Sequence, residues 1–379
     1  MLDYSKLLSF YKGKKVLITG NTGFKGSWLS YLLISAGADV TGYALKPESD
    51  LSMFNLICLD KEKAINQIYG DIRDTERVIN CFGEVRPEIV IHMAAQPIVR
   101  ESYKNPVYTY GTNVMGTVNV CEAVRRTEAV RSFLNVTTDK VYKNREWDRG
   151  YKEDDELDGA DPYSNSKSCS ELVTHSYKKS FFDNLNNVKN SPRVSVSTAR
   201  AGNVIGGGDF SMDRIIPDCV RAIMSEGVIN VRNPHSTRPY QHVLEPLFAY
   251  LTIMAKQYDN SAYAGYYNVG PEDSDCITTG DLVTCFCEKW NGNNDLLNAS
   301  TKCLSWVNKA EINAPHEANF LKLDCSKLKA VFDWQPRWNI EEAISETVAW
   351  TRVWLDSTDE HAIRAEMAHE IEKYIGNEI

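Results

Sequence analysis

Two side chains that can move a proton stand one helical turn apart in this sequence. Tyr163 and Lys167 occur in the segment YSNSK, and a spacing of four residues places a phenol and an ammonium on the same face of a helix. A free tyrosine has a pKa of about 10 and is a poor base near pH 7. A nearby lysine cation favours the phenolate, which can remove a proton from a hydroxyl group. The same spacing occurs by chance in many chains, so its weight depends on where it lies in the fold.

A second group of polar residues follows an apolar run. The segment RSFLNVT (131–137) is typical of a buried strand, and Thr138, Asp139 and Lys140 come directly after it. The carboxyl end of a parallel strand faces the ligand crevice of its sheet. Thr138 could there hydrogen-bond a substrate hydroxyl, with Asp139 and Lys140 beside it as an acid and a base. Alone, these charges would more often be a solvated turn, but the tyrosine–lysine pair favours the catalytic interpretation.

Glycines recur at every third position between an apolar run, VLIT, and an amphipathic segment. Gly20 permits a tight turn, Gly23 lets a pyrophosphate approach the backbone, and Gly26 lets the helix pack closely on the strand. This placement predicts a dinucleotide-binding turn; the alternative is a structural loop without a ligand. The positive charge of an oxidised nicotinamide would add to that of Lys167 in favouring a tyrosine phenolate.

The sequence does not decide between NAD and NADP. An acidic residue usually closes the second strand and holds the adenosine ribose of NAD, but Ala44 stands at that position and no arginine replaces it. Asp71, after the expected third strand, could hydrogen-bond an adenine amino group. It could equally cap the following helix.

The elements that must position these residues alternate between strand and helix. Apolar runs predict strands, and residues at helical spacing predict helices. Asp161 as a cap and Pro162 at the first position mark the start of the last of these helices. The expected strands are 16–19, 39–45, 88–93 and 131–137, and the expected helices include 113–126 and 162–179.

Such alternation predicts an α/β fold with a Rossmann doubly wound parallel sheet. We expect an NAD-binding domain over residues 1–200, together with a helix at 242–258. The punctuation by glycine and proline after residue 200 predicts that 201–379 form mainly a smaller α/β substrate-binding cap domain.

Composition excludes several classes of protein. With 42 Lys and Arg against 51 Asp and Glu in 379 residues, the net charge is −9, which argues against a nucleic-acid-binding protein. We expect no signal peptide, because the lysines of the N-terminal segment come late, and no membrane-spanning segment. The ten cysteines form no CxxC pair and no metal-binding spacing, so we expect no metal and a reducing, cytoplasmic location.

Together these motifs resemble the extended short-chain dehydrogenase/reductase family, which acts largely on nucleotide sugars, and within it the branch that dehydrates CDP-glucose. The likeness covers nearly the whole chain. It is carried by GNTGFKGSWLS (20–30), HMAAQPIVRESY (92–103), TNVMGTVN (112–119), TTDKVYKNREW (137–147), DPYSNSKSCSEL (161–172), RAGNVIGGGD (200–209), RPYQHVLEPL (238–247) and HEANFLKLDCSK (316–327).

The resemblance implies a catalytic NAD and a role for each residue of the two polar groups. Tyr163, assisted by Thr138 and Lys167, would take the proton from the sugar O4 while hydride leaves C4. Lys140, at a position where many related dehydratases carry glutamate, would be the base at C5, and Asp139 would protonate the departing O6. Hydride would then return to C6, giving CDP-4-keto-6-deoxy-D-glucose.

The resemblance also implies the binding residues and the biological setting. The partner would be CDP-glucose, the protein a homodimer, and the product would serve deoxysugar synthesis for lipopolysaccharide or a similar surface polysaccharide. The implied cofactor contacts are Gly20, Thr22, Gly23, Phe24, Lys25, Gly26, Asp71, Ile72, Ala94, Ala95, Gln96, Asn113, Tyr163 and Lys167. The implied substrate contacts are Arg100, Asn203, Arg214, Arg232 and Arg238.

Two positions depart from the family pattern. Asn21 stands where histidine is more common, which would affect NAD affinity, and Val141 replaces a cysteine, which we interpret as packing. The alternatives are a nucleotide-sugar 4-epimerase, a 4,6-dehydratase of another nucleotide-hexose, and a non-catalytic NAD-binding regulator. The acid/base pair after Thr138 argues against an epimerase, and the intact tyrosine and lysine argue against a regulator.

Overall fold

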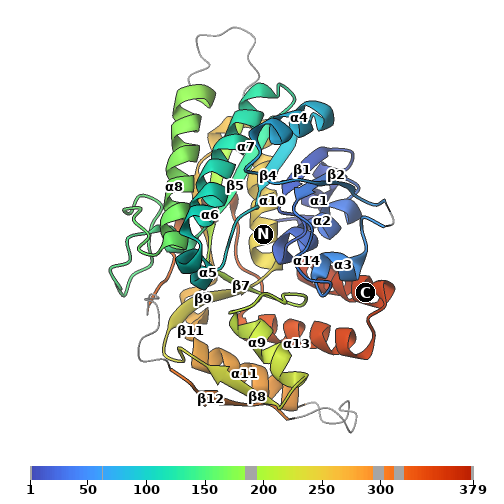
Figure 1. Ribbon diagram of the computed structural model, residues 1–379, viewed down its shortest axis with the longest axis vertical. Coiled ribbons are helices and arrows are strands. Elements are labelled where there is room, and N and C mark those ends of the chain that lie inside the picture. Colours follow the sequence, from blue (N-terminus) through green and yellow to red (C-terminus); the bar gives the residue numbers. More distant parts are fainter. Residues whose placement is uncertain (1, 62, 184–193, 293–302, 311–319, 377–379) are drawn as a thin grey trace.

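The computed structural model describes residues 2–61, 63–183, 194–292, 303–310 and 320–376. Its centre is a seven-stranded sheet in the order β10-β6-β5-β4-β1-β2-β3, with every neighbouring pair parallel (Figure 1). The strands are β1 (Lys15–Thr19), β2 (Asp39–Ala44), β3 (Asn66–Tyr69), β4 (Ile89–His92), β5 (Ser132–Thr138), β6 (Ser195–Ala201) and β10 (Tyr266–Val269). The predicted doubly wound α/β fold is confirmed.

The inner strands β1, β4, β5 and β6 are buried on both faces of the sheet, whereas the edge strand β3 is only partly buried. Leu17, Val90 and Phe133 face one core, which is completed by α4 (Thr75–Val85) and α7 (Gly116–Arg126). Val16 and Ile18 face the larger core on the opposite side. That core is covered by α1 (Tyr4–Tyr11), α2 (Phe24–Ser35), α3 (Met53–Ile57), α10 (Leu244–Asp259) and α14 (Glu360–Ile375).

The helices around the predicted tyrosine–lysine pair form one layer. Helix α8 (Pro162–Tyr177) packs beside α7 and is preceded along the chain by α5 (Val99–Lys104) and α6 (Pro106–Tyr110). The expected helix at 113–126 begins within a short π-helix, Gly111–Met115. The expected helix at 162–179 ends at Tyr177 and is followed by a second short π-helix, Lys178–Phe182.

Within the described residues, two small sheets and three helices lie beyond the carboxyl ends of the central strands, at the bottom of Figure 1, and we call them the lower layer. One sheet has the order β11-β9-β7 and the other β12-β8. These strands are β7 (Asn203–Ile205), β8 (Val228–Val231), β9 (Thr237–His242), β11 (Cys276–Thr278) and β12 (Ser305–Asn308). The helices are α9 (Ile215–Ile223), α11 (Thr279–Asn291) and α13 (Ile340–Asp356), whereas α12 (Ser326–Phe332) packs against the edge strand β10.

The predicted division near residue 200 stays a prediction. Most elements after this point belong to the lower layer, but α10 packs against β5 and β6, and β10 is the edge strand of the central sheet.

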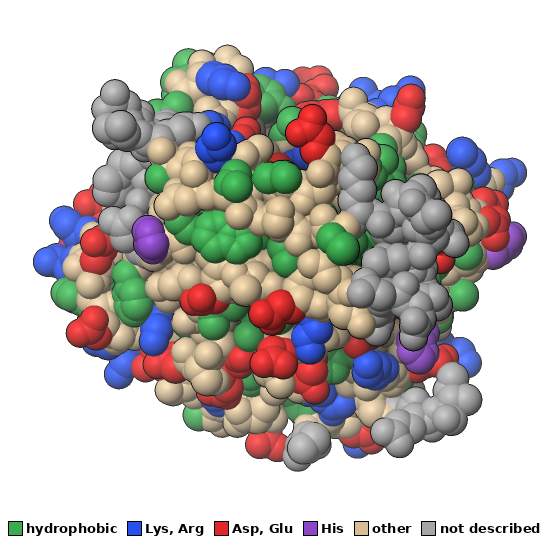
Figure 2. Space-filling model, turned by 90° about the horizontal axis from the view of Figure 1, so that it is seen from below, with side chains coloured by type: hydrophobic (Ala, Val, Ile, Leu, Met, Phe, Trp, Pro, Cys, Tyr) green, Lys and Arg blue, Asp and Glu red, His purple; other side chains and the backbone are tan. Residues whose placement is uncertain are grey.

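Seen from below, the surface mixes acidic, basic and hydrophobic side chains, with no continuous basic stripe on the described part of this face (Figure 2). No helix in the described ranges is both long and apolar enough to cross a membrane.

Candidate active site

A cavity of about 540 Å³ lies where the central sheet meets the lower layer. Its wall includes the end of β5, the first turn of α8, the glycine-rich turn and the segment from β7 to β9. This is the carboxyl edge of the parallel strands, where ligands of doubly wound folds bind. The cavity brings together Thr138, Lys140, Tyr163 and Lys167, as the sequence predicted.

Helix α8 starts at a well-defined cap, which fixes the position of Tyr163. The Asp161 side chain accepts a hydrogen bond from the Ser164 backbone at 3.0 Å, with Pro162 in the first turn. The backbone N–H of Tyr163 donates to Ser102 Oγ at 3.1 Å, which ties this turn to α5. The phenol therefore enters the cavity from a rigid helix end.

The cation that acts on Tyr163 differs from the expectation: the positive charge that lowers its pKa comes from Arg214, and Lys167 is not among the causes. Burial raises the pKa of Tyr163 to about 12, opposed by a hydrogen bond with Thr138 and by the positive charge of Arg214. The Lys167 ammonium donates to the backbone carbonyl of Val136 at 2.9 Å, and burial lowers its pKa to about 8. Arg214, from the other side of the cavity, thus contributes a cation that the sequence analysis did not place beside the tyrosine.

Asp139 lies behind Thr138 and is not among the residues lining the cavity. Its side chain is only 1% exposed, Oδ1 accepts from Thr138 Oγ1 at 2.8 Å, and Oδ2 has no hydrogen-bond partner among the described residues. Burial raises the pKa of this carboxyl, opposed mainly by Lys140. A carboxyl that tends to keep its proton suits an acid better than a base.

Lys25 reaches the same cavity from the glycine-rich turn. Burial lowers its pKa to about 7, and the charges of Arg214 and Lys167 act in the same direction. Its ammonium lies 6.0 Å from the centre of the Tyr250 ring. Because several cations meet here in an acidic protein, the cavity suits an anionic ligand.

The glycine-rich turn fits a dinucleotide. Gly20 has a φ of +76°, and a Cβ there would lie 2.7 Å from the Ala94 backbone. A Cβ on Gly26 would lie 2.3 Å from the Gly20 carbonyl oxygen, whereas one on Gly23 would meet nothing closer than 3.5 Å. Helix α2 begins at Gly23 without a side-chain cap, so its first N–H groups can bind a phosphate.

Structural contacts hold Asn21, which departs from the family pattern, and two residues of the predicted cofactor set, Gln96 and Asn113. Asn21 is fully buried, lies against Gly42 and donates to Gln67 Oε1 at 2.6 Å, so its side chain braces β2 and β3. The side-chain oxygen of Asn113 accepts from the Gln96 backbone at 2.8 Å, which fixes the loop after β4. The cavity includes Lys25, Ala95, Tyr163 and Lys167 from the predicted cofactor set, and the other members lie outside its lining.

Asp71 does not cap a helix. Asp74 caps α4, because its side chain accepts from the Arg77 backbone at 3.1 Å. Asp71 instead accepts three hydrogen bonds from the Arg73 guanidinium, at 3.1, 3.0 and 2.6 Å, and this contact lowers its pKa. The alternative assignment of Asp71 as a cap was therefore wrong, since the capping residue lies three residues later.

All five predicted substrate residues line the cavity: Arg100, Asn203, Arg214, Arg232 and Arg238. Arg214 forms an ion pair with Asp209 at 3.2 Å, and Arg232 forms one with Asp213 at 2.6 Å. Sequence reasoning missed these two acids. A signal was available for Asp209, which closes the quoted block RAGNVIGGGD.

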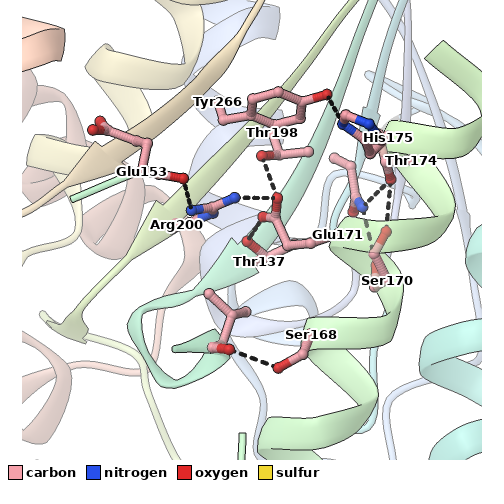
Figure 3. Close-up of polar contacts among 12 residues, drawn as sticks. Thr137, Glu153, Ser168, Ser170, Glu171, Thr174, His175, Thr198, Arg200 and Tyr266 are labelled. Carbon is pink, nitrogen blue, oxygen red and sulfur yellow. Dashed lines mark hydrogen bonds and ion pairs between the residues drawn. The ribbon is translucent and has the colours of Figure 1, made fainter. Parts of the chain in front are cut away.

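A buried ion pair connects the tyrosine–lysine helix to the central sheet (Figure 3). Glu171 of α8 pairs with Arg200 of β6 at 3.0 Å, with side chains 1% and 3% exposed. Glu171 also accepts from the hydroxyls of Thr137 and Thr198. Its negative charge raises the pKa of Lys167, against the effect of burial. The pair therefore fixes α8 to the sheet and helps to keep Lys167 protonated.

The described residues hold no group of histidine, cysteine, aspartate or glutamate that could bind a metal. Of the quoted block 316–327, residues 316–319 lie outside the described residues.

Comparison with known proteins identifies relatives over most of the chain. The sequence profile of the GDP-mannose 4,6-dehydratase family matches residues 17–347. The CDP-glucose 4,6-dehydratase of Salmonella typhimurium is 44% identical over 352 residues, which cover 93% of this chain and 94% of that protein.

Solved structures of similar proteins share the fold. The dTDP-glucose 4,6-dehydratase of Bacillus anthracis, in complex with NAD, has a TM-score of 0.70 at 21% identity, covering 89% of this chain and 96% of that one. The UDP-glucose 4-epimerase of Thermotoga maritima, with UDP-glucose, has a TM-score of 0.72 at 20% identity, covering 90% of this chain and 99% of that one. Dehydratases and epimerases share this architecture, so the fold by itself does not separate the two reactions.

Proposed function

The chain belongs to the GDP-mannose 4,6-dehydratase family, and we propose that it converts CDP-D-glucose into CDP-4-keto-6-deoxy-D-glucose and water. The observation that carries the reaction type is a single cavity lined by Tyr163, Lys167, Thr138 and Lys140, with Asp139 behind it. The relative at 44% identity carries the choice of nucleotide.

NAD fits the glycine-rich turn, whose uncapped helix start and open Gly23 can receive a pyrophosphate. When bound, this cofactor accepts a hydride from C4 of the sugar and returns it to C6. Lys25, Tyr163 and Lys167 would hold it from the cavity side. The cluster of cations there also suits the phosphates of a nucleotide sugar.

The chain's own residues supply the proton transfers. Tyr163 removes the O4 proton as the hydride leaves C4, with Thr138 and Arg214 favouring the phenolate. The resulting 4-ketone acidifies the proton at C5, which Lys140 removes. We assign the protonation of O6, as the C6–O6 bond breaks, to Asp139, because burial raises the pKa of this carboxyl and so favours the acid.

Arg238 and its neighbours would bind the nucleotide diphosphate. The arginines are spread along the cavity wall, and Arg214 and Arg232 are held in place by acidic partners. An arginine fixed in this way presents its remaining N–H groups to a phosphate at little cost in side-chain entropy.

The assembly and setting form part of the proposal. Exposed hydrophobic side chains on and beside α8, among them Leu172 at 55% and Phe181 at 45%, support pairing of α7 and α8 with a second copy of the chain. Cys121 and Ala123 of α7 are buried in the protein's own core and cannot take part. The protein would be cytoplasmic, and its product would serve deoxysugar synthesis for lipopolysaccharide or a similar polysaccharide.

The test is NMR of the purified protein with catalytic NAD and CDP-, UDP-, dTDP- or GDP-glucose, each supplied separately. We expect a 6-methyl signal and a 4-keto carbon from CDP-glucose alone. A methyl signal from another nucleotide would keep the reaction and change the substrate. Inversion at C4 with the C6 hydroxyl retained would make the protein an epimerase, and Asp139 and Lys140 would lose their roles.

A further inference from the structure

The carboxyl end of strand β2 is the place where a doubly wound fold recognises the adenosine ribose of its dinucleotide. A carboxylate at this point hydrogen-bonds the 2′-hydroxyl of NAD and repels the 2′-phosphate of NADP. In this chain β2 ends at Ala44, and Leu45, Lys46 and Pro47 follow it. The group that usually excludes NADP is therefore missing from this strand end.

Lys46 brings a cation to the same place. Its side chain is exposed, and its ammonium lies 5.6 Å from the centre of the Tyr69 ring. Tyr69 is the last residue of β3, and it is the partner of Ala44 in the register of the two strands. The Lys46 ammonium thus lies beside the strand end that lacks the carboxylate.

Arg77 brings a second cation from another part of the chain. It lies exposed on the first turn of α4, and its guanidinium donates a hydrogen bond to the backbone carbonyl of Tyr69. The sequence places no arginine after β2, so this cation reaches the strand end only because β3 and α4 pack beside it. Two cations therefore contact the residue that neighbours Ala44.

Protein carboxylates leave both cations available. Among the described residues, neither Lys46 nor Arg77 forms an ion pair. Asp60 is the acid that contacts Tyr69, and it accepts from the hydroxyl end of that ring at 3.0 Å. Positive charge that no carboxylate of the protein takes up can bind an anionic group of a ligand.

The glycine-rich turn is joined directly to this strand end. Thr22 Oγ1 donates to the Leu45 carbonyl at 2.9 Å, and the Gly20 N–H donates to the Tyr43 carbonyl at 2.9 Å. A dinucleotide with its pyrophosphate at the start of α2 places its adenosine half over the end of β2. A phosphate on the 2′-oxygen would there face the two cations.

We propose that this site binds NADP as well as NAD, with Lys46 and Arg77 holding the 2′-phosphate. A basic side chain near the end of the second strand has this role in doubly wound folds that bind NADP. NAD still binds, because Ala44 removes one hydrogen bond to the ribose and introduces no repulsion. The inference rests on the proposed function only in that the glycine-rich turn holds a dinucleotide.

The first test is calorimetric titration of the cofactor-free protein with NAD and, separately, with NADP. The two dissociation constants should differ by less than about tenfold, because no carboxylate repels the additional phosphate. Lys46→Met should weaken NADP by about tenfold, through loss of one charge-assisted contact, and should leave NAD within about twofold. A larger gap between the dinucleotides in the wild type, or equal losses of both in Lys46→Met, would overturn the proposal.

The second test restores the usual acid. Ala44→Asp should tighten NAD and weaken NADP by at least about tenfold, since the new carboxylate would bind the ribose hydroxyls and repel the 2′-phosphate. Arg77→Met should weaken NADP selectively, and Arg77→Lys, which keeps the charge, should recover most of that loss. If Ala44→Asp changed both constants by the same factor, the adenosine ribose would not lie at this strand end.

The matched control is Lys12→Met, which removes an exposed lysine at the end of α1, before β1 and so at the amino edge of the sheet. It should change neither dissociation constant. Because the titrations contain no CDP-glucose, a wild-type protein that forms no 6-methyl product would refute the proposed function, while the two dissociation constants would still decide this inference.

Discussion

Removal of the carboxylate of Glu171 should destabilise the protein strongly, because three buried groups depend on it. Arg200 forms its ion pair with Glu171 at 3.0 Å, and the hydroxyls of Thr137 and Thr198 donate to the same carboxylate (Figure 3). Glu171→Leu would leave a guanidinium that is 3% exposed without its counter-charge. The change would also leave two hydroxyl groups without their acceptor.

The cost can be worked out from these contacts. Breaking a buried ion pair from one side costs about 3–5 kcal/mol of the free energy of unfolding, since an uncompensated charge remains. Arg200 keeps its bonds to the Tyr142 hydroxyl at 2.8 Å and the Glu153 carbonyl at 2.9 Å, which places the expected loss toward the lower end, about 3 kcal/mol. Replacement of both partners, Glu171→Leu with Arg200→Met, should cost less than the sum of the two single changes.

The assay is urea denaturation of the cofactor-free protein, followed by tryptophan fluorescence and circular dichroism, with coincidence of the two transitions checked. The matched control is Glu156→Gln, which breaks two exposed pairs, with Lys143 and Arg145, and should leave the midpoint unchanged. A loss below about 1 kcal/mol for Glu171→Leu, or an additive double variant, would refute the reasoning.

Three further predictions follow from the site. Gly23→Ala should fold normally but bind NAD more weakly in calorimetry. Gly26→Ala should instead lower the midpoint of unfolding, because its Cβ would lie 2.3 Å from a backbone oxygen. Equal effects of the two changes would contradict the geometry of the glycine-rich turn. The stability of wild type relative to Lys167→Met should rise by about 3 kcal/mol as the pH rises from about 8 to 10.5, because in this range Lys167 is protonated in the unfolded chain and neutral in the folded one. A flat difference in urea unfolding would count against a buried cation at this position. Tyr163→Phe should abolish oxidation at C4. Lys140→Ala should still exchange hydride at C4 but no longer eliminate water, and both steps can be measured with substrate deuterated at C4. Equal loss of both steps in Lys140→Ala would contradict its role as the base.

Local sequence determined the elements and the main features of the site. Continuous apolar runs predict strands such as β1 and β4. The cap Asp161 and the following Pro162 predict the start of the helix that carries Tyr163. Spacing by four then places Lys167 beside it, and the end of an apolar strand places Thr138 at the crevice. These features depend on residues close together in the chain, so the sequence alone predicts them.

Contacts between distant segments depended on the tertiary structure. Arg214 acts on Tyr163 from across the cavity, and Arg200 meets Glu171 only because β6 lies beside β5 under α8. Likewise Asn21 turned out to brace β2 and β3. A sequence pattern reports periodicity within one element, whereas the direction of a side chain and its partners are set by the order of strands and the packing between layers.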